Sequence, residues 1–143
     1  MAKITLEIVT PEKAVFHEDV DEVILPGADG ELGILPGHLP LMTTLRSGRL
    51  VAIDGGQQQF FAVHQGFAEI LPDKVIVLTD AAEDAANIDA DRARAAMERA
   101  EQALKEAEGK PQGEEATELD AAEIQRRALE RARARLVVSE ENK

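Results

Sequence analysis

Five of the ten residues from 126 to 135 are arginines, in a chain whose formal net charge is −12. Arg127, Arg131 and Arg135 recur at intervals of four residues, so on a helix they would form a single stripe. A guanidinium group carries a planar fork of donors that matches the paired oxygens of a phosphate or a carboxylate. These residues therefore indicate binding chemistry directed at an anion.

The charge of the rest of the chain makes this segment unusual. Residues 1–86 hold 5 basic and 14 acidic side chains, residues 87–119 hold 5 and 9, and residues 120–143 hold 6 and 5. An acidic body repels nucleic acid, because nucleic-acid binding depends on neutralising phosphates. We therefore expect no nucleic-acid partner, and only the last segment suits an anion.

Side chains that commonly carry catalysis or bind metals are scarce. The chain has no cysteine, and its three histidines, His17, His38 and His64, lie in separate stretches without the spacing of metal ligands. The glycine-rich stretch 27–38 lacks the Gly-Lys-Ser/Thr ending of a phosphate-binding loop, so its glycines are assigned to turns. We expect no catalytic residue, no metal site and no enzymatic activity of the chain alone.

The hydropathy pattern also argues against a membrane segment. No apolar run approaches the ~18 residues of a membrane-spanning helix. The first residues, MAKITLEIVTPEK, alternate between apolar and polar side chains and lack the apolar centre of a signal peptide. We expect a soluble chain on the cytoplasmic side, without direct membrane insertion.

The first part of the chain has the period of β-strands. Ile4, Leu6 and Ile8 alternate with polar residues, as in a half-buried strand. Apolar runs flank turn sequences at 54–56 and 71–73, which are hairpin signals. Short strands at such regular intervals favour an all-β sandwich or barrel, and we expect it to occupy residues 1–86.

Residues 87–143 have the period of helices. Asn87 or Asp89 can cap a first helix, whose apolar face comprises Ala93, Met97, Ala100, Leu104 and Ala107. The segment 109–113 contains glycine and proline and ends this helix, and 117–120 resembles a capping sequence. A second helix then extends to about Val138, with Ala128, Leu129, Ala132 and Leu136 on its apolar side. The predicted fold class is therefore β + α: an N-terminal β-sandwich followed by a C-terminal antiparallel two-helix hairpin.

This hairpin would bring arginines of both helices together. Arg92 and Arg99 share a face of the first helix, and antiparallel pairing places them near Arg131 and Arg135. Four converging guanidinium groups repel one another unless an anion lies between them. The alternative is a solvated basic face whose arginines pair with glutamates of their own helix, namely Glu98, Glu123 and Glu130.

The inner faces of the predicted helices consist mostly of alanine. Alanine favours helix formation but buries little apolar area, so we expect helices that are locally stable and weakly docked. A plain, stably packed hairpin remains the alternative.

Two longer segments carry a family resemblance. GELGILPGHLPLMTTLRSG (30–48) and NIDADRARAAMERAE (87–101), together with the two-part plan, resemble the ε subunit of bacterial F-type ATP synthases along essentially the whole chain. The resemblance implies a non-catalytic subunit of the central stalk that contacts the γ subunit and the ring of c subunits. Glu31 and His38 lie in the matching loop and are the expected contact residues. It also implies a peripheral position on the cytoplasmic face of the bacterial plasma membrane, as part of the complex.

The same resemblance implies a regulatory role for the hairpin. In this family the folded hairpin lies on the sandwich, and the extended one runs along γ and blocks ATP hydrolysis by the α/β catalytic head. Some members bind ATP in the folded hairpin, which implies ATP as a regulatory ligand and no required cofactor. The positions that match the family's ATP-binding pattern are Glu83, Ile88, Asp89, Arg92, Ala93, Arg99, Arg131 and Arg135.

Two other interpretations remain open at this point. One is a purely structural stalk adaptor without ATP binding or inhibition, in which case the arginines face acidic protein partners. The other is a free β-sandwich binding module with an arginine-rich tail, which the acidic body and the absence of Trp and Tyr disfavour. Titration with ATP distinguishes the regulator from the adaptor.

Overall fold

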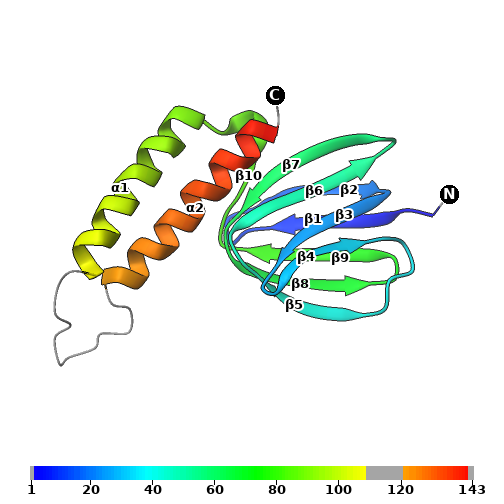
Figure 1. Ribbon diagram of the computed structural model, residues 1–143. Coiled ribbons are helices and arrows are strands. Elements are labelled where there is room, and N and C mark those ends of the chain that lie inside the picture. Colours follow the sequence, from blue (N-terminus) through cyan, green and yellow to red (C-terminus); the bar gives the residue numbers. More distant parts are fainter. Residues whose placement is uncertain (1, 109–120, 142–143) are drawn as a thin grey trace.

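The structure is a computed structural model that describes residues 2–108 and 121–141 (Figure 1). Within these residues, ten strands precede one 3₁₀ turn and two helices. The strands are β1 (Ile4–Val9), β2 (Ala14–Val20), β3 (Glu22–Gly27), β4 (Gly30–Ile34), β5 (Leu41–Leu45), β6 (Gly48–Asp54), β7 (Gln57–Val63), β8 (Gly66–Leu71), β9 (Lys74–Thr79) and β10 (Ala82–Asp84). The helical elements are η1 (Ala85–Asn87), α1 (Ala90–Glu108) and α2 (Ala121–Glu141).

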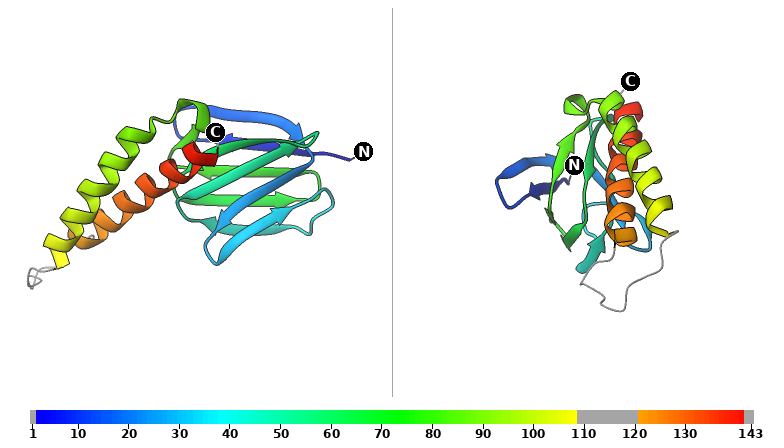
Figure 2. Two further views of the ribbon diagram at one scale, coloured as in Figure 1. Left: turned by 45° about the horizontal axis from the view of Figure 1, so that its top comes forward. Right: turned by 90° about the vertical axis from the view of Figure 1, so that its left-hand side faces the viewer.

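The strands form one continuous sheet that folds over on itself into a sandwich. Its order is β10-β7-β6-β3-β5-β8-β9-β1-β2, with β4 paired to β3. Neighbouring strands run antiparallel except β1 and β9, which pair in parallel. Figure 2 shows β6 and β7 next to the helices and β1 and β9 on the far side of the core. The predicted fold class is confirmed.

The sandwich core follows the alternation seen in the sequence. Ile4, Leu6 and Ile8 are fully buried, and the residues between them are half-buried. They pack with buried side chains from both layers, including Val23, Leu25, Leu50, Phe61, Ile70, Val75 and Val77. The predicted turn at 54–56 joins β6 to β7, and the positive φ angles of Gly55 and Gly56 suit the tight connection of a hairpin.

Asp89, rather than Asn87, caps the first helix. Its Oδ1 accepts a hydrogen bond from the Arg92 backbone N–H at 3.1 Å, and its carbonyl accepts one from Ala93 at 3.0 Å. Asn87 closes the preceding 3₁₀ turn η1. The second helix extends to Glu141, three residues beyond the expected end. The predicted helix break at 109–113 and capping sequence at 117–120 lie outside the described residues.

The hairpin contacts the sandwich through α2. This helix lies over β6 and β7, and α1 packs on α2 rather than on the sheet (Figures 1 and 2). A second apolar cluster at this junction comprises Val51, Phe60, Ala62, Ala85 and Val138. Most of the other buried side chains of α2 are alanines. The division into units 1–86 and 87–143 stays a prediction, since the two parts are in contact.

Val138 is the α2 residue of the junction cluster, and it is fully buried. We expect Val138→Ala to destabilise the docked state by about 2 kcal/mol through lost burial and a small cavity. Val137→Ala is the matched control, because Val137 is 46 % exposed and its loss should change stability by less than about 0.5 kcal/mol. Amide hydrogen exchange along α2 would measure the stability of the docked helix in both variants. Equal protection in the two variants would contradict a role of the junction cluster in docking α2.

Candidate functional site

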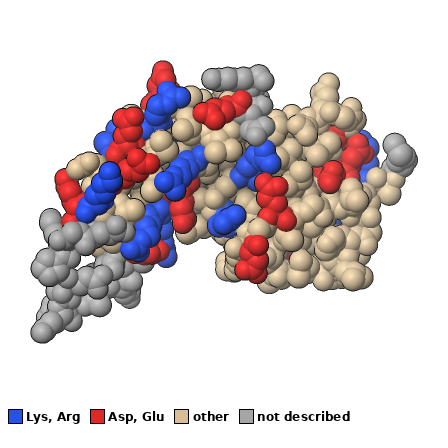
Figure 3. Space-filling view, in the orientation of Figure 1, with Lys and Arg blue, Asp and Glu red and all other residues tan. Residues whose placement is uncertain are grey.

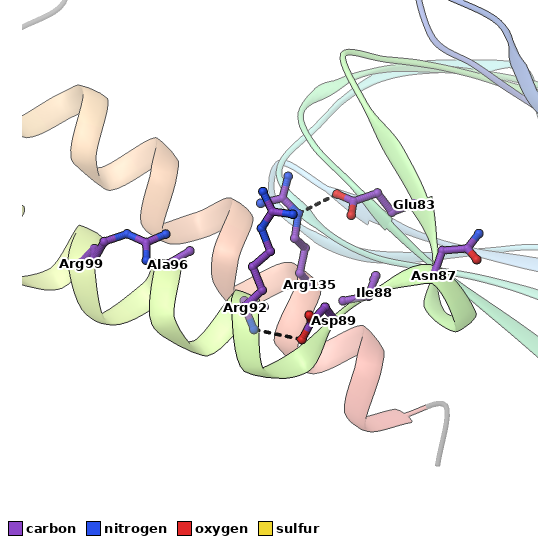
Figure 4. A pocket seen from close by; sticks show the side chains of 9 residues that line it. Glu83, Asn87, Ile88, Asp89, Arg92, Ala96, Arg99 and Arg135 are labelled. Atoms are coloured by element: carbon purple, nitrogen blue, oxygen red, sulfur yellow. Dashed lines mark hydrogen bonds and ion pairs between the residues drawn. The ribbon is translucent and has the colours of Figure 1, made fainter.

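A pocket of about 460 Å³ lies where the hairpin joins the sandwich (Figure 4). Its lining comes from β10, the η1 connection, the first turns of α1 and the last turns of α2. The residues are Glu83, Asn87, Ile88, Asp89, Arg92, Ala93, Ala96, Arg99 and Arg135. The pocket is therefore lined by segments that lie about fifty residues apart in the chain, such as those of Glu83 and Arg135.

Two of the three pocket guanidinium groups are available to a ligand. Within residues 2–108 and 121–141, the side chains of Arg92 and Arg99 make no hydrogen bond or ion pair. The third, Arg135, donates from Nε to Oε1 of Glu83 at 2.6 Å. An unpaired guanidinium favours an anion at short range, so the pocket can hold a ligand with several anionic oxygens.

Arginines outside the pocket mostly follow the alternative interpretation of a solvated basic face. Arg94 pairs with Asp91 at 3.2 Å, Arg126 and Arg127 both pair with Glu123, and Arg133 lies 3.8 Å from Glu101. Figure 3 shows basic and acidic side chains interleaved over the two helices. Among the described residues, Arg92 and Arg99 lack such pairs, as does Arg131, but only Arg92 and Arg99 line the pocket.

Glu83 is the acidic centre of the junction. Its Oε1 accepts hydrogen bonds from Nε2 of His64 at 3.0 Å and from Nε of Arg135 at 2.6 Å. The hydrogen bond from His64, and then the bond and charge of Arg135, lower the pKa of Glu83 to about 2 against the opposing effect of burial. Glu83 is therefore ionised at physiological pH and links the sheet to α2.

The lowered pKa of Glu83 predicts that this part of the fold is sensitive to acid. An unfolded chain binds a proton at Glu83 near the ordinary value of 4.5, so the stabilisation is complete above that pH and is lost as the pH falls toward 2. We expect a loss of about 1–2 kcal/mol over this range, discounted for partial exposure of the carboxylate. Urea unfolding of the native chain and of Glu83→Gln at a series of pH values tests this. Equal pH dependence of the two proteins would contradict it.

Seven of the eight residues predicted from the ATP-binding pattern line the pocket. The exception is Arg131, which lies half-buried one turn before Arg135 on α2 and contributes no lining atoms. The sequence interpretation missed Asn87 and Ala96. Ala96 lies four residues after Arg92, on the same helical face, so helical spacing alone could have identified it.

The predicted stalk-contact residues lie in different surroundings. Glu31, in β4, accepts a hydrogen bond from Arg49 at 3.2 Å and lines a second pocket together with Arg133 of α2. His38 lies in the loop before β5, where its Nδ1 is 2.6 Å from the carbonyl oxygen of Leu39. The structure therefore places Glu31 beside the hairpin and His38 in an exposed loop.

The loop of His38 adjoins an exposed apolar surface that the sequence interpretation missed. Leu39 is 79 % exposed and Met42 is 68 % exposed, and Leu35 and Leu41 are also exposed. Phe67 and Leu78, which are register partners on β8 and β9, are exposed as well. We call Leu35, Leu39, Leu41 and Met42 the apolar face. Several large exposed apolar side chains within one short segment are typical of a protein contact.

No group of three or more His, Cys, Asp or Glu side chains in the ranges 2–108 and 121–141 is arranged to hold a metal ion. In the same ranges, no helix is both long and apolar enough to cross a membrane.

Comparisons with known proteins give a consistent result. Residues 3–85 match the family model described as ATP synthase, Delta/Epsilon chain, beta-sandwich domain. The whole chain is 45 % identical to the ATP synthase epsilon chain of Dehalococcoides mccartyi strain BAV1, over 96 % of that protein. It is 46 % identical to the corresponding protein of Syntrophobacter fumaroxidans, over 96 % of each chain.

Solved structures share the fold. A chain in the cryo-EM structure of the Euglena gracilis mitochondrial ATP synthase, OSCP/F1/c-ring, superposes with a TM-score of 0.77 at 23 % identity, covering 94 % of this chain and 79 % of that one. A chain of the Tetrahymena thermophila mitochondrial ATP synthase central stalk and c-ring has a TM-score of 0.56 at 10 % identity, with coverage of 98 % and 96 %.

Proposed function

The chain belongs to the ATP synthase epsilon-chain family, and from that membership we propose that it is a non-catalytic central-stalk subunit that binds ATP in its docked hairpin and inhibits ATP hydrolysis when the hairpin is released. Its proposed partners are the γ subunit, the c-ring and the α/β catalytic head. The proposed location is the cytoplasmic face of the bacterial plasma membrane, as a peripheral part of the complex.

The pocket at the junction is the observation that carries the nucleotide-binding part. Arg92 and Arg99 are unpaired among the described residues, and Arg135 faces them from the other helix. Three guanidinium groups suit the charge of a triphosphate. Ile88, Ala93 and Ala96 supply apolar contact for a base, since small side chains leave room against α1.

The carboxylates of the pocket are compatible with the same ligand. Among the described residues, Glu83 uses Oε1 and Asp89 uses Oδ1 for their hydrogen bonds. One oxygen of each remains to accept hydrogen bonds from an adenine amino group or a ribose hydroxyl. The pocket therefore offers donors for phosphates and acceptors for the nucleoside.

Regulation follows from which elements line the pocket. Because β10, α1 and α2 all contribute side chains, a ligand that contacts all three binds only the docked hairpin. Such a ligand stabilises the docked form by about 1.4 kcal/mol at a tenfold excess over its dissociation constant. When ATP is scarce, this stabilisation is lost and the helices, each about 30 Å long, become free to extend along the stalk.

The apolar face and the loop of His38 are the surface that we assign to the γ subunit and the c-ring. Leu39 and Met42 adjoin His38 in the chain and are largely exposed. Glu31 makes its ion pair with Arg49 on another part of the surface, beside α2. A contact through Glu31 would therefore be affected by the position of the hairpin.

Calorimetric titration of the full chain with ATP tests the nucleotide site. We expect saturable binding of one ATP per chain, and weaker binding of AMP because it offers fewer phosphate oxygens to the arginines. Absence of binding at millimolar ATP would leave a structural stalk adaptor as the function.

The inhibitory part has its own experiment. We expect ATP hydrolysis by the assembled enzyme to increase when the chain is truncated after residue 87. Unchanged hydrolysis, with the truncated chain still incorporated, would exclude inhibition by the hairpin.

A further inference from the structure

His64 is a buried polar residue that the function proposed above does not use. Only 2 % of its surface is exposed, and it follows directly after β7. Its ring Nε2 lies 3.0 Å from Oε1 of Glu83, whereas Nδ1 has no partner among the described residues. Because a carboxylate only accepts hydrogen bonds, Nε2 is the nitrogen that carries the proton in this contact.

The sheet register explains how these two side chains meet. Glu83 pairs with Ala62, and the backbone N–H of His64 donates to the carbonyl of Ala81 at 3.1 Å. His64 and Glu83 are therefore diagonal neighbours on one face of the β7–β10 ladder. Ala62, on that face, packs in the junction cluster with Val138 of α2. His64 thus faces the hairpin side of the sandwich.

The backbone around His64 is fixed by several further bonds. Its N–H also lies 3.2 Å from Oγ1 of Thr79, and that hydroxyl lies 2.6 Å from the carbonyl of Gln65. Gln65 adopts a positive φ of 58°, a conformation that non-glycine residues adopt only when their surroundings hold them there. These hydrogen bonds hold the backbone at His64 in place and so restrict the position of its imidazole ring.

The hydrogen bond between His64 and Glu83 affects the orientation of the Arg135 side chain, because Glu83 also bonds Arg135. Arg135 uses Nε for Glu83, and its terminal nitrogens make no hydrogen bond to any described residue. A guanidinium held through Nε has its orientation fixed while both terminal amino groups stay available as a fork. Glu83 alone can rotate about its side-chain bonds, and the bond from His64 restricts that rotation.

We propose that His64 is a positioning residue for the nucleotide site, which acts through Glu83 to orient the guanidinium of Arg135 toward the phosphates of a nucleoside triphosphate. This inference rests on the proposed function. It assigns to a buried sandwich residue a part in ligand binding on the hairpin, without contact between His64 and the ligand.

Two amide substitutions at position 64 distinguish a role of His64 in positioning Glu83 from a role in packing alone. His64→Gln places an amide nitrogen near the position of Nε2, whereas the shorter His64→Asn places one near Nδ1, the atom that has no partner. We expect His64→Gln to bind ATP within about twofold of the native chain and His64→Asn to bind about tenfold more weakly. In an Arg135→Lys background, the difference between Gln and Asn at position 64 should disappear, since lysine lacks the fork.

A second readout does not depend on ATP. In NMR spectra of the full chain, we expect the Nε–H of Arg135 to exchange slowly with solvent in the native protein and in His64→Gln, and rapidly in His64→Asn. Glu83→Gln should also accelerate this exchange, which tests the bond between Glu83 and Arg135 through which His64 acts.

The outcomes are distinct. If the native chain binds no ATP, the nucleotide-binding part of the proposed function fails, and unchanged Arg135 exchange across the variants would separately overturn the role of His64. If the native chain binds ATP and the Gln and Asn variants bind equally well, the proposed function stands and the positioning role is wrong. Weaker binding by His64→Asn that persists in the Arg135→Lys background would also contradict it.

Discussion

Replacing Arg92 and Arg99 together with alanine is expected to weaken ATP binding by the full chain at least about 100-fold. Both side chains line the pocket and are unpaired among the described residues. A charge-assisted hydrogen bond contributes about 1.5–3 kcal/mol, so losing two of them gives an effect of this size even when the losses are not additive. Calorimetry with ATP measures it directly.

A double variant with the same charge change serves as the control. Arg94 and Arg126 are exposed, and each pairs with a carboxylate of its own helix. We expect Arg94→Ala with Arg126→Ala to change ATP affinity less than about threefold, because exposed charges are largely screened. Equal losses in the two double variants would mean that overall charge, and not the pocket, attracts the nucleotide.

The second large effect concerns Gly66, where β8 begins. Its φ is +142°, and a Cβ added there would overlap the carbonyl oxygen of Leu78 and lie 2.9 Å from Cα of Thr79. Neither neighbour is the end of a flexible side chain, so the sheet itself would have to shift. We expect Gly66→Ala to lower the free energy of unfolding by about 4 kcal/mol or more.

Gly30→Ala is the matched control for Gly66→Ala. Gly30 has a similar φ of +136°, but nothing lies within 4 Å of the position of an added Cβ. It should show the cost of the backbone conformation alone, about 1–2 kcal/mol. Urea unfolding of the two variants distinguishes the cost of the backbone conformation from the cost of the steric overlap of the added Cβ. Equal losses of unfolding free energy would show that the close approach of Gly66 to Leu78 is unimportant.

Strong local patterns predicted most of the fold. The alternation of Ile4, Leu6 and Ile8 and the turn at 54–56 gave correct strands, and helical spacing gave both helices. Strands β2, β4, β5 and β10 were not predicted. In β2 the side chains alternate poorly, because it is an edge strand with mostly exposed or half-buried residues. In β10 there are only three residues, too few for a periodic signal.

The site was predictable where it depends on one helix and less so where it depends on tertiary contacts. Spacing along α1 placed Arg92 and Arg99 on one face. Both Arg131 and Arg135 were predicted, but which of them lines the pocket depends on the rotation of α2 about its axis, which no local pattern determines. The contact of His64 with Glu83 depends on the register of β7 with β10. Residues 19 positions apart meet only once that pairing exists.

The division of the pocket between the sheet and two helices also has a kinetic consequence. Glu83 belongs to the sheet, whereas the arginines belong to the helices. A ligand held by both would have to dissociate before the helices separate from the sandwich. The lifetime of the bound ligand would then set the shortest delay of the response. With an association rate constant of about 10⁶ M⁻¹ s⁻¹, a micromolar site releases its ligand about once per second, and the subunit would not respond to shorter falls in nucleotide concentration.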